Sequence, residues 1–281
     1  MTSKERLLSA MRCQKPDHTP CAPFGLGRLD RESPMAQELI ARTDPFLPVG
    51  VSSDPFIGRK AQVETRERGN CRESRLHTPK GELLRRVEHT AATSATVEYP
   101  LKTLDDMEKM LSVPYEPPEI NAARYFAYQR DIGEEGLVLA PIPNAVAFAA
   151  SSFGPQQFCL LWATAPQELI RLTETMNQRL KQHVERCCSK GINHFRIVGG
   201  EYVSVQLGPE AMPDLIRKPD RELINIIHAH DGIAFYHNHG PMMAFLEDYA
   251  YIGVDFLEPM EAPPWGDVDL REAARRIDGR Y

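Results

Sequence analysis

The segment Gly-Ile-Ala-Phe-Tyr-His-Asn-His-Gly at residues 232–240 gives the strongest indication of the fold. Its first half is apolar and has the length of a buried strand. Because alternate residues of a strand face the same side, His237 and His239 are expected to point the same way where the strand ends. Two imidazoles placed there suit the binding of a metal or a reacting anion better than core packing. The segment therefore predicts a buried strand that ends in an active site, with a pair of hydrogen-bonded core histidines as the alternative.

Other apolar stretches also end in polar residues. We expect strands near residues 20, 50, 138, 196, 235 and 256, with helices between most of them. The polar residues that follow these strands are Asp54, Asn144, Glu201, Tyr202, Glu258 and Glu261. Strands that alternate with helices predict parallel pairing through right-handed crossovers. Polar residues just after such strands are typical of the active site of an α/β protein of the (β/α) barrel type.

An open doubly wound sheet is the alternative architecture, since it also binds ligands at its strand ends. Its dinucleotide-binding form carries Gly-x-Gly-x-x-Gly after the first strand. Residues 25–28 read Gly-Leu-Gly-Arg and supply only two of those glycines. The barrel is therefore favoured.

Residues 63–98 interrupt the alternation of strands and helices. They are rich in alternating and β-branched residues, and they surround the turn signals Gly69-Asn70 and Pro79-Lys80-Gly81. This composition predicts a small antiparallel insertion. The following Thr103-Leu104-Asp105-Asp106 has the pattern of a helix start.

The composition is that of an ordinary soluble protein with one large domain. The 281 residues are 42% hydrophobic and 26% charged, and the formal net charge is −6. Lysine and arginine are scattered, which argues against nucleic-acid or anionic-membrane binding. No apolar run approaches the length of a membrane span, and the N-terminal residues lack the apolar core of a signal peptide. A cytoplasmic location is expected.

Several segments together resemble the uroporphyrinogen decarboxylase superfamily. The resemblance rests on Glu5–Arg12 followed by Lys15–Pro20, and on four later runs along the whole chain. These later runs are Thr78–Leu83, Glu98–Lys102, Gly200–Tyr202 and His237–Gly240, with Gly266–Leu270 near the end. The resemblance implies a single (β/α)8 barrel domain over residues 1–281. It also implies one of two chemistries, namely decarboxylation of a tetrapyrrole or methyl transfer involving a corrinoid protein, usually with zinc.

The chain departs from the family pattern in two places, of which the first argues against tetrapyrrole decarboxylation. The decarboxylases carry an Arg-Gln-Ala-Gly-Arg-Tyr run after the first strand, whereas residues 25–31 here read Gly-Leu-Gly-Arg-Leu-Asp-Arg. The methyltransferases typically bind zinc through a His-x-Cys pair and a later cysteine, whereas this chain has His237 and His239 at the position of the pair. The chain therefore matches the family in the position of the pair, but its second ligand is histidine where the family has cysteine.

The expected metal set is His237, His239 and Glu201, with Glu258 or Glu261 as the next choice for the third ligand. Zinc would activate a substrate thiol, or polarise a methyl ether or amine, with methylcobalamin on a partner protein as the other reactant. We expect Glu258 and Glu261 to be catalytic, or else to cap helices or hold loops. Asp54, Asn144 and Tyr202 are the expected substrate contacts. Decarboxylation of a porphyrinogen or another polycarboxylate, and a non-catalytic binding barrel, are the alternative functions.

The number of strands is smaller than the resemblance implies. Six barrel strands are expected here, against eight in the family, and residues 279–281 fall where a seventh should begin. The expectation is a barrel truncated after six strands that lacks its last two βα units. An unpaired edge strand would result.

Overall fold

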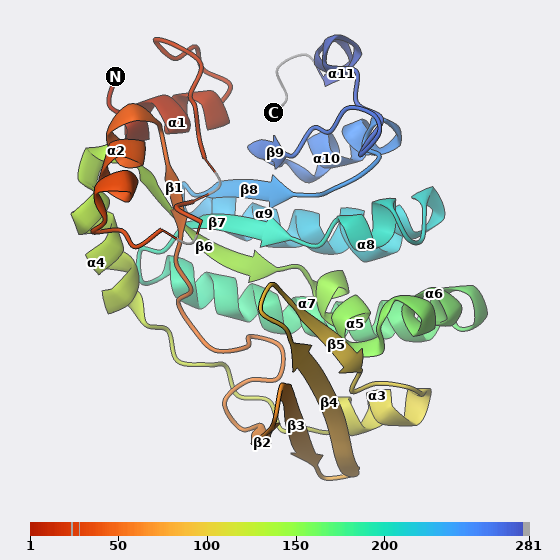
Figure 1. Cartoon of the computed structure of the whole chain (residues 1–281). Helices are drawn as coiled ribbons and strands as arrows, with labels where there is room; N and C mark the ends of the chain where they lie inside the picture. The colour runs from red at the N-terminus through yellow and green to blue at the C-terminus, as the bar shows by residue number, and fades with distance from the viewer. Residues whose placement is uncertain (24, 28, 278–281) are drawn as a thin grey trace.

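The computed structural model describes residues 1–23, 25–27 and 29–277. Its centre is a five-stranded sheet in the order β1-β6-β7-β8-β9, in which every neighbouring pair is parallel. The strands are β1 (Phe46–Pro48), β6 (Leu137–Pro143), β7 (His194–Val198), β8 (Ile233–His237) and β9 (Phe256–Glu258). Figure 1 shows β6, β7, β8 and β9 running side by side. The strand order places β1 and β9 at opposite edges of the sheet. The sheet is a partial barrel of the expected α/β type, open between those two edges.

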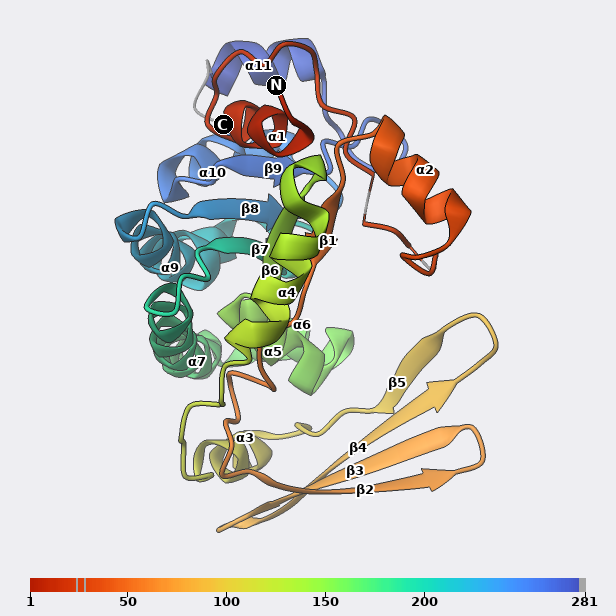
Figure 2. The same cartoon turned by 90° about the vertical axis from the view of Figure 1, so that its left-hand side faces the viewer.

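Helices cover one face of this sheet. The long α7 (Pro166–Cys188) and α9 (Lys218–Ala229) lie side by side there, with α10 (Leu246–Ile252) beside them (Figure 2). The other helices are α2 (Pro34–Arg42), α4 (Ala122–Ile132), α5 (Ala145–Phe153), α6 (Pro155–Thr164), α8 (Glu201–Ser204) and α11 (Leu270–Ile277). Within the described residues, no helix combines the length and apolar character needed to cross a membrane.

Alternate residues of the strands enter two different apolar clusters. Val138, Ala234 and Tyr236 belong to the large cluster under the covering helices. Leu139 and Phe235, one position along, belong to a smaller cluster on the opposite face. This division follows from the two-residue period of a strand, and both faces are apolar because both are covered.

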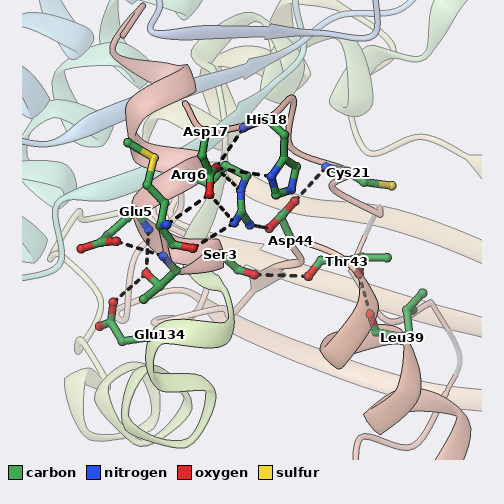
Figure 3. Close-up of polar contacts among 12 residues, drawn as sticks. Ser3, Glu5, Arg6, Asp17, His18, Cys21, Leu39, Thr43, Asp44 and Glu134 are labelled. Atoms are coloured by element: carbon green, nitrogen blue, oxygen red, sulfur yellow. Dashed lines mark hydrogen bonds and ion pairs between the residues drawn. The ribbon is translucent and has the colours of Figure 1, made fainter. Parts of the chain in front are cut away.

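The N-terminal helix α1 (Ser3–Met11) covers the smaller cluster. Thr2 and Glu5 form a reciprocal capping box at its start, and Leu7 and Met11 are buried against the sheet. Arg6 on the same helix forms ion pairs with Asp17 and Asp44 (Figure 3). Asp44 also accepts a hydrogen bond of 2.9 Å from the backbone N–H of Cys21. These contacts hold the chain after α1 against the body.

The predicted antiparallel insertion is present and forms a separate sheet. It consists of β2 (Gln62–Arg68), β3 (Cys71–Thr78), β4 (Gly81–His89) and β5 (Ser94–Glu98), paired in sequence order. In Figure 2 this sheet projects away from the parallel one. The insertion is attached through β4, which contacts α3 (Leu104–Leu111), and through the buried Leu76 and Leu83. Thr103 caps α3 as the sequence indicates.

The structure corrects the expected number of parallel strands. The strand predicted near residue 20 is not formed at 19–23, and Phe24 lies outside the described residues, as do Arg28 and 279–281. Pro20 and Pro23 lack an N–H to donate to a sheet, which explains why this apolar stretch stays irregular. The parallel sheet therefore has five described strands rather than six.

Burial of α1 should contribute measurably to stability. Replacing the buried Leu7 by alanine removes apolar contacts and leaves a cavity beneath α1. We expect the free energy of unfolding to fall by about 2–5 kcal/mol. The control is Leu160→Ala, because Leu160 is 49% exposed on α6. Chemical denaturation that gives equal losses for both variants would contradict this packing.

Candidate active site

The two histidines of the 237–239 segment lie together at the carboxyl end of β8, where His237 is the last strand residue and His239 follows the strand. Their ring centroids are 4.6 Å apart and the rings are perpendicular. The side chain of His237 is 9% exposed, whereas that of His239 is 56% exposed. One imidazole is therefore held inside the protein and the other stands at its surface. The side-by-side placement expected from the spacing is what the structure shows.

Each imidazole is paired with a carboxylate through the same ring atom. His237 Nδ1 lies 2.6 Å from Glu258 Oε1, and His239 Nδ1 lies 3.2 Å from Glu261 Oε1. An ionised carboxylate can only accept, so Nδ1 must carry the proton in each pair. The lone pair of the neutral ring is then on Nε2, the atom that can accept a proton or bind a metal.

The strand register places the first pair. His237 is opposite Val198 on β7 and opposite Glu258 on β9, so the three form one row across the sheet. Arg196 is two residues before Val198 on the same face, and its Nη2 donates to Glu258 Oε1 at 3.0 Å. A guanidinium and an imidazole N–H thus share one carboxylate oxygen, which stabilises its charge in a largely buried position.

The second pair is fixed by the loop after β8. The backbone N–H of Gly240 donates to Glu261 Oε2 at 2.8 Å. This hydrogen bond, together with that from His239, lowers the pKa of Glu261 although partial burial opposes the shift. Gly240 has φ of +89°, a backbone conformation that favours glycine, and so the sequence His-Gly is what lets the amide reach the carboxylate.

A buried amide supports the segment between the histidines. The carboxamide oxygen of Asn238 accepts from the hydroxyl groups of Tyr249 at 2.7 Å and Ser204 at 3.2 Å. Asn238 Nδ2 donates to the backbone oxygen of His239 at 2.9 Å. A Cβ at Gly200 would lie 2.1 Å from the Asn238 oxygen, so a side chain there is excluded. The ends of β7 and β8 are thereby packed together.

A second buried network lies on the opposite face of β8. The hydroxyl of Tyr236 donates to Asp220 Oδ2 at 2.5 Å, and Asn144 Nδ2 donates to the same atom at 3.0 Å. Asp220 is completely buried, and this burial raises the pKa of its carboxyl group to about 7. Because Tyr236 precedes His237, the network fixes the strand that carries the site.

The remaining predicted site residues are not brought into the histidine cluster. Asn144 is completely buried and caps α5 through the N–H of Ala147, so it positions a helix. Glu201 is in the first turn of α8, with Oε2 buried and without a hydrogen-bond partner among the described residues. Tyr202 packs edge-on against Phe158 at 6.5 Å between ring centroids. Their predicted roles stay predictions.

Asp54 lines a separate cavity of about 260 Å³ at the same end of the sheet. Its Oδ1 accepts from the backbone N–H groups of Phe56 and Ile57. Pro143 also lines this cavity and is opposite Val198, which is opposite His237. With a strand spacing of about 4.8 Å, the cavity wall is therefore about 10 Å from His237. The cavity and the two histidines therefore lie at the same end of the sheet, where the parallel strands have their carboxyl ends.

Arg196 is the site residue that the sequence analysis missed. The signal was available, because an arginine between Phe195 and Ile197 in a short apolar strand needs a buried partner. Its partner, Glu258, is distant in sequence and adjacent only through the sheet. The sequence pattern of one β-strand reveals that a charged residue is buried, but it does not reveal which residue of another strand neutralises the charge.

The described residues fit only part of a zinc site. A histidine whose Nδ1 is held by a carboxylate is the usual arrangement of a metal-binding imidazole, and both histidines have it. However, no group of three His, Cys, Asp or Glu side chains among the described residues is placed to hold a metal ion. Glu201 is thus not grouped with the histidines as a third ligand. A complete zinc site is not present in this arrangement.

Comparisons with known proteins bear on the fold. No protein-family model and no curated protein sequence matches the chain. Solved structures do match, among them one described as a methyltransferase from Methanosarcina mazei. The two align with a TM-score of 0.63 at 12% sequence identity, and the alignment covers 100% of this chain and 81% of that one. This likeness supports the architecture of the partial barrel.

The buried Asp220 should make stability depend on pH. A carboxyl group whose pKa rises from 3.8 to about 7 on folding binds more protons in the folded state. Its contribution is complete below the unfolded pKa and is lost as the pH rises to about 7. We expect Asp220→Asn to remove this fall in unfolding free energy. The control is Asp214→Asn at an exposed position, and denaturation curves with the same pH dependence for all three proteins would contradict the assignment.

Proposed function

We propose that this protein is a methyltransferase whose acting groups are the His237–Glu258 and His239–Glu261 pairs. The observation that carries the proposal is the 2.6 Å contact between His237 Nδ1 and Glu258 at the carboxyl ends of parallel strands. The structural likeness to the Methanosarcina mazei methyltransferase supports this reaction class. The sequence resemblance to the uroporphyrinogen decarboxylase superfamily, in its methyltransferase branch, supports it as well.

The proposed role of His237 is that of a general base. A thiol or hydroxyl acceptor becomes a better nucleophile when its proton passes to Nε2 as the methyl group is attacked. Glu258 would stabilise the imidazolium that forms, while the Nδ1 hydrogen bond keeps the ring in the required orientation. Arg196 holds Glu258 in place through its hydrogen bond.

The proposed methyl source is methylcobalamin carried by a partner protein, which would supply an activated methyl group. The exposed His239 stands where a partner can approach it. The proposal also includes dependence of the reaction on zinc. The two histidines would provide two ligands through Nε2. Because a metal-bound Nε2 has no lone pair left for a proton, zinc there would activate the acceptor in place of the general-base role of His237, and that role applies to the protein without the metal.

Loss of the buried imidazole should abolish methyl transfer. With free methylcobalamin and a small thiol or phenol as acceptor, we expect His237→Ala to lower the rate on the order of 100-fold. The control is His89→Ala, which changes an exposed histidine at the end of β4. The methylated product is followed by mass spectrometry. No methyl transfer by the unmodified protein, or release of carbon dioxide from a polycarboxylate instead, would contradict the proposal.

Metal content tests the zinc part separately. If the two histidines bind zinc, purified protein should contain it, and His237→Ala and His239→Ala should each lose it, whereas His89→Ala should retain it. Elemental analysis measures the stoichiometry. Zinc that is absent from the unmodified protein, or that survives both substitutions, would remove zinc from the proposal and leave the general-base role.

A further inference from the structure

A cavity of about 360 Å³ lies on the face of the sheet that α1 covers. It is lined by residues from α1, from the irregular segment after it and from three strands. These are Leu7, Ala10, Met11, Thr19, Pro20, Ala22, Phe46, Phe235, Phe256 and Glu258. Among them, Glu258 is the only ionisable residue. The cavity therefore begins among apolar side chains and ends at the carboxylate that holds His237.

Three phenyl rings form one wall of the cavity. The ring centroid of Phe235 lies 5.0 Å from that of Phe46 and 4.8 Å from that of Phe256. These are the distances at which aromatic rings interact favourably, and they leave a continuous aromatic surface. In a closed barrel, this interior would be filled by layers of side chains. Here the sheet is open between β1 and β9, and the space next to the rings is a cavity.

The polar end of the cavity has no net charge. The carboxylate of Glu258 is matched by the Arg196 guanidinium at 3.0 Å, and the same oxygen also receives the Nδ1 proton of His237. A ligand ion placed there would meet an already neutralised pair and would lose its hydration without gaining a partner. A neutral ligand with one hydrogen-bond donor loses less, and the carboxylate can accept that bond.

The wall opposite the rings is held in place by polar contacts. Cys21 lies between the lining residues Pro20 and Ala22. Its backbone N–H donates to the carboxylate of Asp44, and its backbone oxygen accepts from the N–H of Asp44. Asp44 in turn forms the ion pair with Arg6 on α1 (Figure 3). The segment around Cys21, which closes the cavity, is thus connected through Asp44 to α1, the helix on its other side. The size of the cavity is comparable to that of small-molecule sites in other proteins.

We infer that this cavity binds a neutral, single-ring aromatic molecule with one hydroxyl group, such as a phenol. The ring would lie against Phe46, Phe235 and Phe256, and the hydroxyl would donate to Glu258, so that for this acceptor the proton would pass to the carboxylate paired with His237 rather than to Nε2. The inference rests on the proposed function, because it names the substrate class of the same site. It accounts for an aromatic, otherwise apolar cavity that ends beside a proposed catalytic base.

Binding measurements with phenol test the inference without turnover. Titration into the isotope-labelled protein should give saturable shifts of the amide signals of residues around the cavity. We expect toluene, benzoate and tetramethylammonium each to bind at least tenfold more weakly, since the first lacks a donor and the others are ions. No saturation by phenol, or equal binding of any of the three, would overturn the inference.

Cavity-filling variants locate the binding. Ala10→Leu in α1 and Ala22→Leu in the irregular segment each add bulk to the lining, and we expect each to weaken phenol binding at least tenfold. The control is Ala41→Leu on the exposed side of α2, which should bind as the unmodified protein does. Equal phenol affinity in all four proteins would overturn the inference. Sedimentation should show one oligomeric state for all four, and a change confined to the two cavity variants would assign the cavity to a second copy of the chain instead.

The outcomes separate this inference from the proposed function. Phenol binding without any methyl transfer would retain the site and refute the methyltransferase proposal. Methyl transfer that proceeds with a small thiol, while phenol does not bind, would retain the proposal and refute the aromatic substrate class. The binding measurements use the metal-free 281-residue chain, and methyl transfer is assayed with and without added zinc, so neither result depends on zinc or on a partner protein.

Discussion

The hydrogen bond between His237 Nδ1 and Glu258 is the interaction on which the site depends. It joins the ends of β8 and β9, which are neighbours only because the two strands pair in parallel with His237 opposite Glu258. A shift of one residue in that register would turn Glu258 to the opposite face of the sheet. The bond also decides which ring nitrogen carries the proton, and so it connects the fold directly to the chemistry of the imidazole.

The environment of this pair follows from the two-sided burial of the sheet. On one face, β8 is held in place by hydrogen bonds among three buried residues, namely Tyr236, Asp220 and Asn144. On the other face, Arg196 completes a neutral cluster above an aromatic surface. Burial raises the energetic cost of an unpaired charge, which explains why the carboxylate has two partners. The alternation of side chains between the two faces of β8 therefore places the supporting network with Asp220 on one face and the proposed reacting groups on the other.

The sequence predicted the elements with strong local signals. The buried strand before His237 and the hairpins around Gly69 and Gly81 have clear periodicity or turn chemistry, and the structure contains them. The segment at 19–23 does not form the predicted strand although it is apolar, because Pro20 and Pro23 have no N–H to donate to a sheet. The short helices α5 and α8 directly after strands were not anticipated, since their caps lie within the strand-end loops.

The site was less predictable than the fold. Period-2 spacing is a local rule that applies only within a strand. Because β8 ends at His237, the contact between the two imidazole rings depends on the loop that carries His239. Which carboxylate serves which histidine depends on strand order and register, which no single stretch of sequence contains. Glu201 comes after β7 and Glu258 is the last residue of β9, the two strands that flank β8. Of these two glutamates only Glu258 reaches an imidazole, because α8 begins at Glu201 and turns the chain away from the row. The pairing of strands in the tertiary structure, rather than the residue type, therefore determines which glutamate contacts a histidine.

The most direct measurement is the tautomer of His237, read from nitrogen chemical shifts of its imidazole at neutral pH. The account predicts that the neutral ring carries its proton on Nδ1 with the lone pair on Nε2, and that Glu258→Gln weakens this preference while His239 keeps its own. A proton on Nε2 in the unmodified protein, or a tautomer unaffected by Glu258→Gln, would contradict the assignment of this pair as the centre of the site.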